Sequence, residues 1–376
     1  MGSYAILFIT PGPAMSVDDG LYGELSKHFS GAIITSSRQE ALIQRKKLGS
    51  FDYYCRKLPM RRRSRQMVRF SLHTILRCIG WRLGGKRFDL VVTYDPLKTG
   101  MLGAVCAPIL RSKLVTEVNG VYTSPAQEMD GSGRLSKKLK RWLLPRVEGF
   151  VLSRADGVKL LFPKQVAQFE KQLRGKAVAA FPCRVNIRAF LECAQEPGTK
   201  EILFAGFPFY LKGVDVLVEA FKLISDEYPD WHLKILGWYP DDTPLMNAIG
   251  KHPRIFHQPP VYHRDMPAQI QGCSIFVLPS RSEAMGRVLV EAMAAGKACI
   301  GADVDGIPSV IDDGVNGLLF TRENPIDLSR KMRLLIAEPE LRNTLGKAAR
   351  ATASAKFTDE VYFRNTEAFY DSVLAR

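Results

Sequence analysis

The sequence predicts an α/β protein built from two domains of similar construction. Short apolar runs alternate with longer segments of helical period through most of the 376 residues, which is typical of parallel sheets flanked by helices. The chain is longer than a single hydrophobic core usually supports, so two domains of ordinary size are expected. A composition of 46% hydrophobic and 24% charged residues is that of a soluble globular protein.

The first domain is predicted over residues 1–190. Each of its apolar runs is short enough to be a strand, and helical segments fill the intervals between them. The strands expected in this domain are 4–10, 31–35, 89–93, 113–118, 158–162 and 177–181.

The second domain is predicted over residues 191–356, and it repeats the alternation after a linker, 184–200, that lacks a strong period. A last segment, 357–376, has apolar residues at roughly helical spacing, so we expect a final helix that could cross back to the first domain. The strands expected in the second domain are 201–205, 231–236, 254–257, 274–278 and 297–300.

The cysteines and the N-terminal apolar run favour a cytoplasmic location. Seven cysteines without a Cys-x-x-Cys pair favour reduced thiols over a disulfide framework or a zinc site, and no structural metal is expected. The first apolar run is broken by Pro11 and is too short for a signal peptide or a membrane span.

Positive charge is concentrated in the first half of the chain. Residues 1–200 contain 34 Lys and Arg against 15 Asp and Glu, whereas residues 201–376 contain 19 against 23. The densest stretch, 56–87, contains eleven basic residues and no acidic one. We expect such a stretch to face an anionic partner.

Two interpretations of this basic stretch stay open. It is either a solvated helix face or a surface for anionic lipid headgroups on the inner face of the cell membrane, where each basic residue adds about 1 kcal/mol. An apolar stripe at helical spacing, Val68, Leu72, Ile75, Ile79 and Leu83, is expected to pack on the sheet. We favour peripheral membrane association, through Arg61, Arg62, Arg63, Arg65 and Arg69.

A strand end, a loop and a helix start follow one another in the segment 274–301. Its apolar run ends at Pro279, and ligands of open α/β sheets collect at the carboxyl ends of such strands. The next helix is expected to run from about Gly286 to Gly296. Its first N–H groups would point beyond the strand end without partners, which suits a phosphate.

Two glutamates flank this helix start. Glu291 lies inside an apolar run, where an unpaired buried carboxylate would cost several kcal/mol, and Glu283 lies in the loop. A ligand that meets both carboxylates and the helix start needs hydroxyls and an anionic group. A sugar nucleotide has both.

The segment resembles the Glu-x7-Glu motif of the family 4 retaining glycosyltransferases, with Glu283 and Glu291 as its glutamates. "ILFAGFPFYLKGVDVLVEAF" upstream and "DGVNGLLF" downstream are similar to other segments of that family. The resemblance is specific over 201–320 and general over 1–186. The positions that match the motif are Pro279, Ser280, Glu283, Gly286, Glu291, Ala292, Met293, Ala294 and Gly296.

The resemblance implies a GT-B fold of two facing Rossmann-like domains, with the donor nucleotide in the second and the acceptor in the first. It implies that Glu291 binds the ribose hydroxyls and that Glu283 faces the sugar near the reacting carbon. Lys212 matches the family's phosphate-binding lysine, whose charge replaces a metal ion, so no cofactor is expected. The other donor-binding residues expected are Gly206, Ser282, Gly286, Arg287 and Val288.

Some positions depart from the family pattern. Phe207 follows Gly206 where the family commonly has an arginine on the diphosphate. Asn119 stands where a sugar-contacting histidine is common, and we expect it to act in catalysis as a donor and acceptor. In the loop "SVDDGLYG", Asp19 and Gly20 are expected to place the phosphate end of the donor or an acceptor.

The remaining aromatic and histidine side chains are given structural roles. Phe207, Phe209 and Tyr210 are expected to pack rather than to form a platform for the base. The histidines show no pattern of partners and are expected to be structural or exposed; they are His73, His252, His257 and His263.

The expected activity is transfer of a sugar, with retention, from a nucleotide sugar to a hydroxyl of a glycan or lipid-linked acceptor, in surface polysaccharide or glycolipid biosynthesis. One alternative is a sugar-nucleotide epimerase on the same fold. Another is a basic nucleic-acid-binding protein, but the basic stretch lacks interleaved aromatic residues, so no nucleic-acid partner is expected. A dinucleotide-dependent oxidoreductase is disfavoured, because no G-x-G-x-x-G follows the first strand.

Overall fold

A computed structural model describes residues 4–10, 19–37, 45–57, 63–128, 137–194 and 199–376 of the chain. The chain forms two compact units. Unit 1 consists of Met1–Gly120, Lys138–Phe181 and Phe363–Arg376, and unit 2 consists of Val121–Lys137 and Pro182–Tyr362. The main division therefore falls between residues 181 and 182, against the predicted 190 and 191.

The sheet of unit 1 has eight strands in the order β3-β4-β2-β1-β5-β6-β7-β8. Neighbouring strands are parallel except for β3 and β4, which pair antiparallel at the edge. The strands are β1 (Ala5–Ile9), β2 (Ser30–Ser37), β3 (Arg45–Leu48), β4 (Phe51–Lys57), β5 (Leu90–Thr93), β6 (Lys113–Val118), β7 (Gly157–Leu160) and β8 (Ala177–Ala180).

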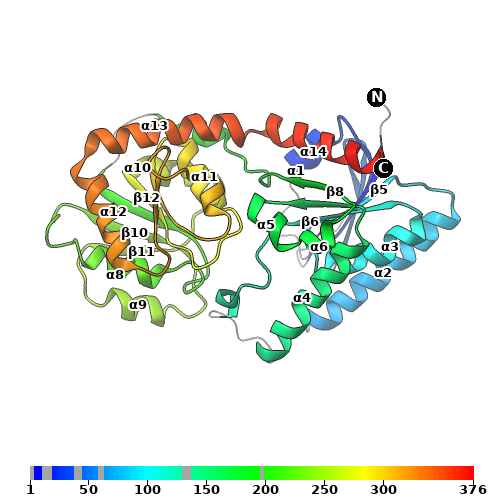
Figure 1. Ribbon diagram of the computed structural model, residues 1–376, viewed down its shortest axis with the longest axis horizontal. Coiled ribbons are helices and arrows are strands. Elements are labelled where there is room, and N and C mark those ends of the chain that lie inside the picture. Colours follow the sequence, from blue (N-terminus) through cyan, green and yellow to red (C-terminus); the bar gives the residue numbers. More distant parts are fainter. Residues whose placement is uncertain (1–3, 11–18, 38–44, 58–62, 129–136, 195–198) are drawn as a thin grey trace. The chain divides into compact units, whose positions relative to one another are not determined.

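Helices cover both faces of this sheet, with α2, α3 and α4 on one face (Figure 1). The inner strands are buried on both sides, as parallel strands between helices must be. The helices are α1 (Asp19–Leu25), α2 (Arg63–Leu83), α3 (Thr99–Leu110), α4 (Lys137–Arg154), α5 (Pro163–Gln168) and α6 (Glu170–Leu173).

The C-terminal residues complete unit 1. Helix α14 (Asp359–Leu374) belongs to this unit from Phe363 onward. The buried Tyr370 packs against Phe29, with ring centroids 5.6 Å apart, and Lys113 Nζ donates a hydrogen bond of 2.9 Å to the carbonyl of Val373. The end of the last helix is therefore part of unit 1.

The sheet of unit 2 has six parallel strands in the order β11-β10-β9-β12-β13-β14. From β9 the chain winds outward through β10 to β11, then returns to β12 on the other side of β9. This reversal creates a switch point between β9 and β12, where open sheets bind ligands. The strands are β9 (Glu201–Ala205), β10 (His232–Leu236), β11 (Ile255–Gln258), β12 (Ile275–Leu278), β13 (Ala298–Ala302) and β14 (Leu318–Phe320).

The helices of unit 2 pack against one another around the sheet. Helix α8 contacts α9 and α12, α12 also contacts α13, and α13 contacts α11 (Figure 1). Helix α11 also contacts α7. The helices are α7 (Arg188–Leu191), α8 (Val214–Lys222), α9 (Thr243–Ile249), α10 (Met266–Gly272), α11 (Arg287–Ala294), α12 (Pro325–Ala337) and α13 (Pro339–Lys356), with short 3-10 turns at Pro125–Glu128, His263–Asp265 and Ile307–Ser309.

The structure confirms the predicted strands within a few residues but adds three that the sequence analysis missed. β3 is a polar edge strand, "RKKL", β4 leads into the basic stretch, and β14 has only three residues. None shows an apolar run of the length by which the other strands were recognised, since the apolar run of β14 is only three residues long.

One prediction about the packing of α2 is wrong. Val68, Leu72, Ile79 and Leu83 do not pack on the sheet but are exposed, and Ile75 is half-buried. The buried face carries Phe70, Thr74 and Cys78 instead. Both sets recur at helical spacing, so the period alone could not decide which of them faces the sheet.

No helix among the described residues is long and apolar enough to span a bilayer.

Glu148 is a buried carboxyl in α4, only 3% exposed, and burial raises its pKa to about 7 from 4.5. Between these two values the folded chain keeps a proton that the unfolded chain releases, so this group lowers stability as pH rises. Glu148→Gln should therefore increase the free energy of unfolding by about 1–3 kcal/mol at pH 8 and by much less at pH 5. Urea unfolding at the two pH values measures this, and an equal effect at both would contradict it.

Candidate functional site

The candidate site lies in unit 2 at the carboxyl ends of β9 and β12. These strands are neighbours in the sheet, so the loops that follow them, 206–213 and 279–286, meet at the same edge. Most of the residues predicted to bind the donor come from these two loops and from the start of α11.

Arg281 ties the two loops together. Its backbone N–H donates to the carbonyl of Leu211 at 2.9 Å, and its guanidinium donates to both carboxylate oxygens of Asp215 at 2.7 Å. Two further bonds of 2.6 Å go to Glu323 and to the carbonyl of Tyr210. The side chain is buried, and its bonds to Asp215 and Glu323 raise its pKa above the usual value although burial by itself would lower it. Arg281 was not among the predicted site residues, because nothing in the local sequence pattern identifies partners 66 and 42 residues away.

A glycine allows the two loops to approach closely. Gly213 has φ of 66°, and a Cβ there would lie 2.0 Å from the carbonyl oxygen of Pro279, so a side chain at this position would force the loops apart. Gly286 has φ of 77°, and a Cβ there would lie 2.7 Å from Leu278 Cδ2 at the end of β12, so this turn before α11 also requires a glycine.

Lys212 and Glu283, both predicted to act in catalysis, form an ion pair. Lys212 Nζ donates to Glu283 Oε2, and the hydroxyl of Ser280 donates to the same oxygen at 3.3 Å. Both charged side chains are mostly buried. Each charge therefore has a partner in the structure and lies beside the strand ends.

The backbone around Glu283 is held by Asp305, which follows β13. Asp305 Oδ2 accepts from the Glu283 N–H at 3.1 Å and from the Ser282 hydroxyl at 2.6 Å. The Gly306 N–H donates back to the carbonyl of Glu283 at 3.0 Å. Ser282, predicted to bind the donor, thus uses its hydroxyl proton to position this loop.

The start of α11 provides backbone donors. The helix begins at Arg287, directly after Gly286, and ends before Gly296, as predicted. Within the described part of the chain, no acceptor is bonded to the N–H of Gly286, Arg287 or Val288. These donors and the positive end of the helix dipole suit an anion.

Glu291 lies one turn into α11 and is 5% exposed. Its Oε1 lies 3.1 Å from Nε2 of His263, a half-exposed residue in the turn before α10. Burial raises the pKa of Glu291, and His263 partly offsets the shift. The carboxylate of Glu291, inside an apolar run, therefore has a partner. This partner could not be identified from the sequence, because His263 is 28 residues away.

Aromatic rings border the end of β9. Phe209 is buried, as predicted, but Phe207 is 48% exposed and so is not a core residue. Its ring lies 5.7 Å from that of the exposed Trp238, which follows β10. Gly206, predicted to bind the donor, directly follows β9, and its carbonyl accepts a 3.2 Å hydrogen bond from Tyr239 Oη.

In unit 1, Asn119 belongs to a polar network at the end of β6. Its Nδ2 donates to Glu117 Oε2 at 3.0 Å and to the carbonyl of Tyr94 at 3.3 Å. Lys159, paired across the sheet with Glu117, donates to that carboxylate at 3.1 Å and to Asn119 Oδ1 at 3.5 Å. The Lys159 and Glu117 side chains are fully buried, so the network fixes the orientation of Asn119.

The other predicted residues of unit 1 are only partly described. Asp19 and Gly20 begin α1, Arg63 and Arg65 lie in the first turn of α2, and the side chains of these four lie outside the description. Arg61 and Arg62 lie outside the described residues, whereas Arg69 is an exposed residue of α2.

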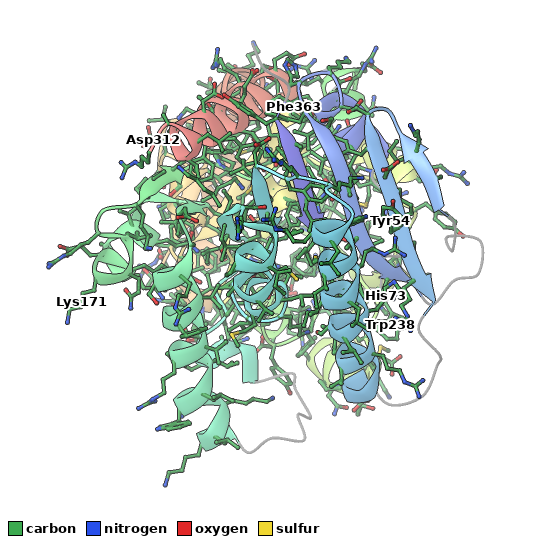
Figure 2. All side chains as sticks on the ribbon, turned by 90° about the vertical axis from the view of Figure 1, so that its right-hand side faces the viewer. Tyr54, His73, Lys171, Trp238, Asp312 and Phe363 are labelled. Carbon is green, nitrogen blue, oxygen red and sulfur yellow. The ribbon has the colours of Figure 1, made fainter. Side chains whose placement is uncertain are left out.

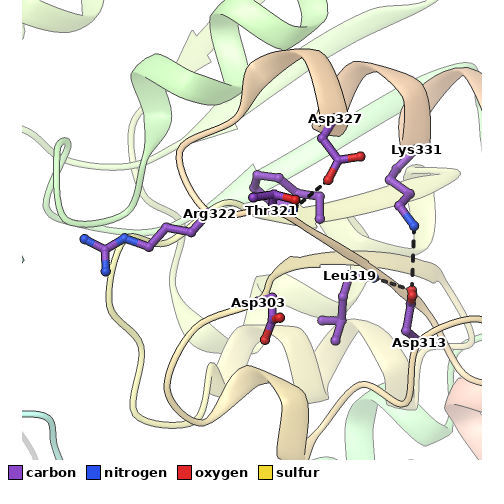
Figure 3. Close-up of a pocket in the computed structure, with 8 residues that line it drawn as sticks. Asp303, Asp313, Leu319, Thr321, Arg322, Asp327 and Lys331 are labelled. Carbon is purple, nitrogen blue, oxygen red and sulfur yellow. Dashed lines mark hydrogen bonds and ion pairs between the residues drawn. The ribbon is translucent and has the colours of Figure 1, made fainter.

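A pocket of about 600 Å³ lies elsewhere in unit 2, beside the ends of β13 and β14 (Figure 3). Several of its polar groups have partners within the pocket: Asp327 accepts from the Thr321 N–H at 2.7 Å, and Lys331 Nζ lies 3.9 Å from Asp313 Oδ1. None of the predicted donor-binding residues lines it.

Among the described residues, no three His, Cys, Asp or Glu side chains converge as metal ligands would.

Comparison with known proteins links the second half of the chain to glycosyl transferases. Residues 192–352 match the family model described as Glycosyl transferases group 1. An uncharacterized glycosyltransferase of Methanocaldococcus jannaschii is 34% identical over 174 residues, which cover 46% of this chain and 48% of that protein. A D-inositol 3-phosphate glycosyltransferase of Arthrobacter is 32% identical, over 46% of this chain and 45% of the relative. The chain thus aligns with about half the length of these curated relatives.

Solved structures resemble the whole chain. A sucrose-phosphate synthase from Thermosynechococcus elongatus has a TM-score of 0.76 at 17% identity and covers 99% of both chains. HepE of Anabaena, solved in complex with UDP, has a TM-score of 0.73 at 17% identity over 98% of this chain and all of its own. These likenesses show that the fold is GT-B, with two Rossmann-like domains, as predicted.

Because the Arg281 guanidinium is buried and bonded to two carboxylates, Arg281→Leu should lower the free energy of unfolding by about 2–4 kcal/mol. The matched control is Arg322→Leu, since Arg322 is half-exposed and, among the described residues, bonds only to its neighbour Glu323, so its loss should cost under about 0.5 kcal/mol. Urea unfolding of the two variants and the wild type measures the difference. Equal stability of both variants would show that Arg281 does not hold the loops.

Proposed function

We propose that this chain is a retaining glycosyltransferase that moves a sugar from a nucleotide-sugar donor to an acceptor hydroxyl. The observation that carries the proposal is the convergence, at the switch point of unit 2, of a helix start, a Lys–Glu pair and a buried glutamate. The match of residues 192–352 to group 1 glycosyl transferases supports it, as does the fold shared with HepE, which was solved with UDP.

In the proposed donor site, each of these groups binds a different part of the nucleotide sugar. The carboxylate of Glu291 accepts hydrogen bonds from the ribose hydroxyls and keeps His263 as its second partner. The diphosphate lies against the N–H groups of Gly286, Arg287 and Val288 and receives the charge of Lys212. Glu283 accepts a hydrogen bond from a sugar hydroxyl, and its ion pair with Lys212 holds the lysine beside the phosphate.

In the proposed reaction, the bond between the anomeric carbon and the phosphate oxygen breaks, and its electron pair leaves with the nucleoside diphosphate. The acceptor oxygen forms its bond on the same face of the sugar, and its proton passes to the departing phosphate. Lys212 and the start of α11 stabilise the negative charge on that phosphate, so we expect no metal requirement.

Phe207 replaces the arginine expected on the diphosphate, so Lys212 is the main side-chain cation at the proposed phosphate position. Its pairing with Glu283 holds the ammonium between the strand ends before a donor arrives. The acceptor is proposed to be a hydroxyl of a surface glycan or glycolipid. The comparisons give no support to an epimerase, an oxidoreductase or a nucleic-acid-binding protein.

A panel of nucleotide sugars tests the proposal. At least one should raise the melting temperature and release nucleoside diphosphate, faster when an acceptor is present and unchanged by EDTA. Interconversion of two nucleotide sugars without release would indicate an epimerase, and the absence of any thermal shift would contradict the proposed site.

Two variants separate binding from transfer. Glu291→Gln should weaken binding of the nucleoside diphosphate by about 10- to 100-fold, because charge-assisted bonds to the ribose are lost. Glu283→Gln should leave that binding within about threefold but lower turnover by 100-fold or more, because the glutamate faces the sugar. Calorimetry and turnover assays on both variants measure this, and unchanged binding by Glu291→Gln would refute the ribose assignment.

A further inference from the structure

Three neighbouring helices form the outer layer on one face of unit 1. Helix α2 packs along α3, and Gly100 of α3 lies so close to α4 that a Cβ there would be 2.8 Å from Val151 Cγ1. Figure 2 shows α2, marked by His73, and α4 with many side chains extending away from the sheet. We call the outward side of α2, α3 and α4 the three-helix surface.

The part of this surface on α2 is apolar along its whole described length. Val68, Leu72, Leu76, Ile79 and Leu83 recur every three or four residues and are exposed, Val68 by 68% and Leu83 by 83%. A continuous exposed stripe of this kind is uncommon on a soluble monomer and marks an interaction site.

The stripe continues onto the other two helices. Met101 and Val105 are exposed one turn apart on α3, and Leu139, Trp142 and Phe150 are exposed on α4. Roughly half of the exposed large hydrophobic residues among those described lie on these three helices.

The charges on the surface have one sign. The sequences of α2 and α3 contain no acidic residue, and the one acidic residue of α4, Glu148, is buried. Exposed basic residues are interspersed with the apolar ones; those described are Arg69, Lys138, Arg141, Arg146 and Arg154.

Two of these arginines pair with aromatic rings on α4. The guanidinium of Arg146 lies 4.2 Å from the ring centre of Trp142, and that of Arg154 lies 4.9 Å from the ring centre of Phe150. Aromatic rings are favoured at the boundary between lipid headgroups and acyl chains, and arginines there keep their charged ends among the headgroups.

We propose that the three-helix surface docks onto an anionic lipid bilayer, with its apolar side chains entering the interface and its basic residues contacting the headgroups. Apolar insertion and a basic cluster together supply the two signals that stable peripheral binding needs. The surface differs from the one expected from the sequence, where only the arginines around Arg65 were assigned to the membrane.

The positive charge of the three-helix surface favours a membrane over the other possible binding partners. A second copy of this surface would place basic residues against basic residues and would be repelled. Nucleic acid would pair with the charges but leave the aliphatic stripe exposed to water. An anionic bilayer complements both features, and each basic residue near it contributes about 1 kcal/mol.

Flotation of the full chain with lipid vesicles tests the proposal. The protein should float with vesicles of phosphatidylcholine mixed with phosphatidylglycerol and stay below with phosphatidylcholine alone. The double variant Leu72→Glu/Leu76→Glu should bind the anionic vesicles at least about tenfold more weakly, because it opposes both insertion and charge attraction. Ile326→Glu, in α12 of unit 2, is the matched control, since Ile326 is as exposed as Leu72, and should bind like the wild type.

Circular dichroism and urea midpoints should show that the variants are folded. We expect them to fold, because the substituted side chains are exposed. A second measurement follows tryptophan fluorescence. The emission of Trp142 should shift to the blue with anionic vesicles, and the variant Trp142→Phe should not show this shift. Equal flotation with neutral vesicles, or full binding by the double variant, would overturn the proposal. A dimer in sedimentation that the double variant dissociates would overturn it in favour of a second copy.

Discussion

The buried guanidinium of Arg281 is the interaction on which the site in unit 2 depends. It fills the space between the loops after β9 and β12 and bonds to carboxylates from α8 and from the segment after β14. A charge at this depth is stable only if its partners stay in place. Lys212 and Glu283, which lie next to the bonded residues in sequence, are thereby held at the strand ends before any ligand binds.

The alternation of apolar runs and helical segments was sufficient to predict two parallel sheets, because buried parallel strands are apolar on both faces. It failed for β3, because an edge strand need not be apolar, and for β14, because an apolar run of three residues is too short to indicate a strand. It also failed for α2, where Phe70, Thr74 and Cys78 and the exposed stripe of Leu72 and Leu76 have the same period. Only the packing of the whole unit selects the buried face.

In the candidate site, too, local features were predictable and long-range contacts were not. The strand end, the loop and the helix from Gly286 to Gly296 are local features, and their glycines and periodicity made them predictable. The partners of the site residues are not local. His263 reaches Glu291, and Asp305 reaches Ser282, because the segments that follow successive parallel strands meet at the same edge of the sheet although more than 20 residues separate the partners. No spacing in the sequence encodes these pairs.

The proposed position of the nucleotide sugar is the edge of the sheet at the ends of β9 and β12. Hydrogen exchange of the backbone amides, with and without the nucleotide sugar that gives the largest thermal shift, tests this position. We expect slower exchange at residues 286–288, whose N–H groups would bond to the phosphate, and in the loop 206–213. Protection confined to the pocket around Asp303 and Asp327, or no protection in unit 2, would contradict it.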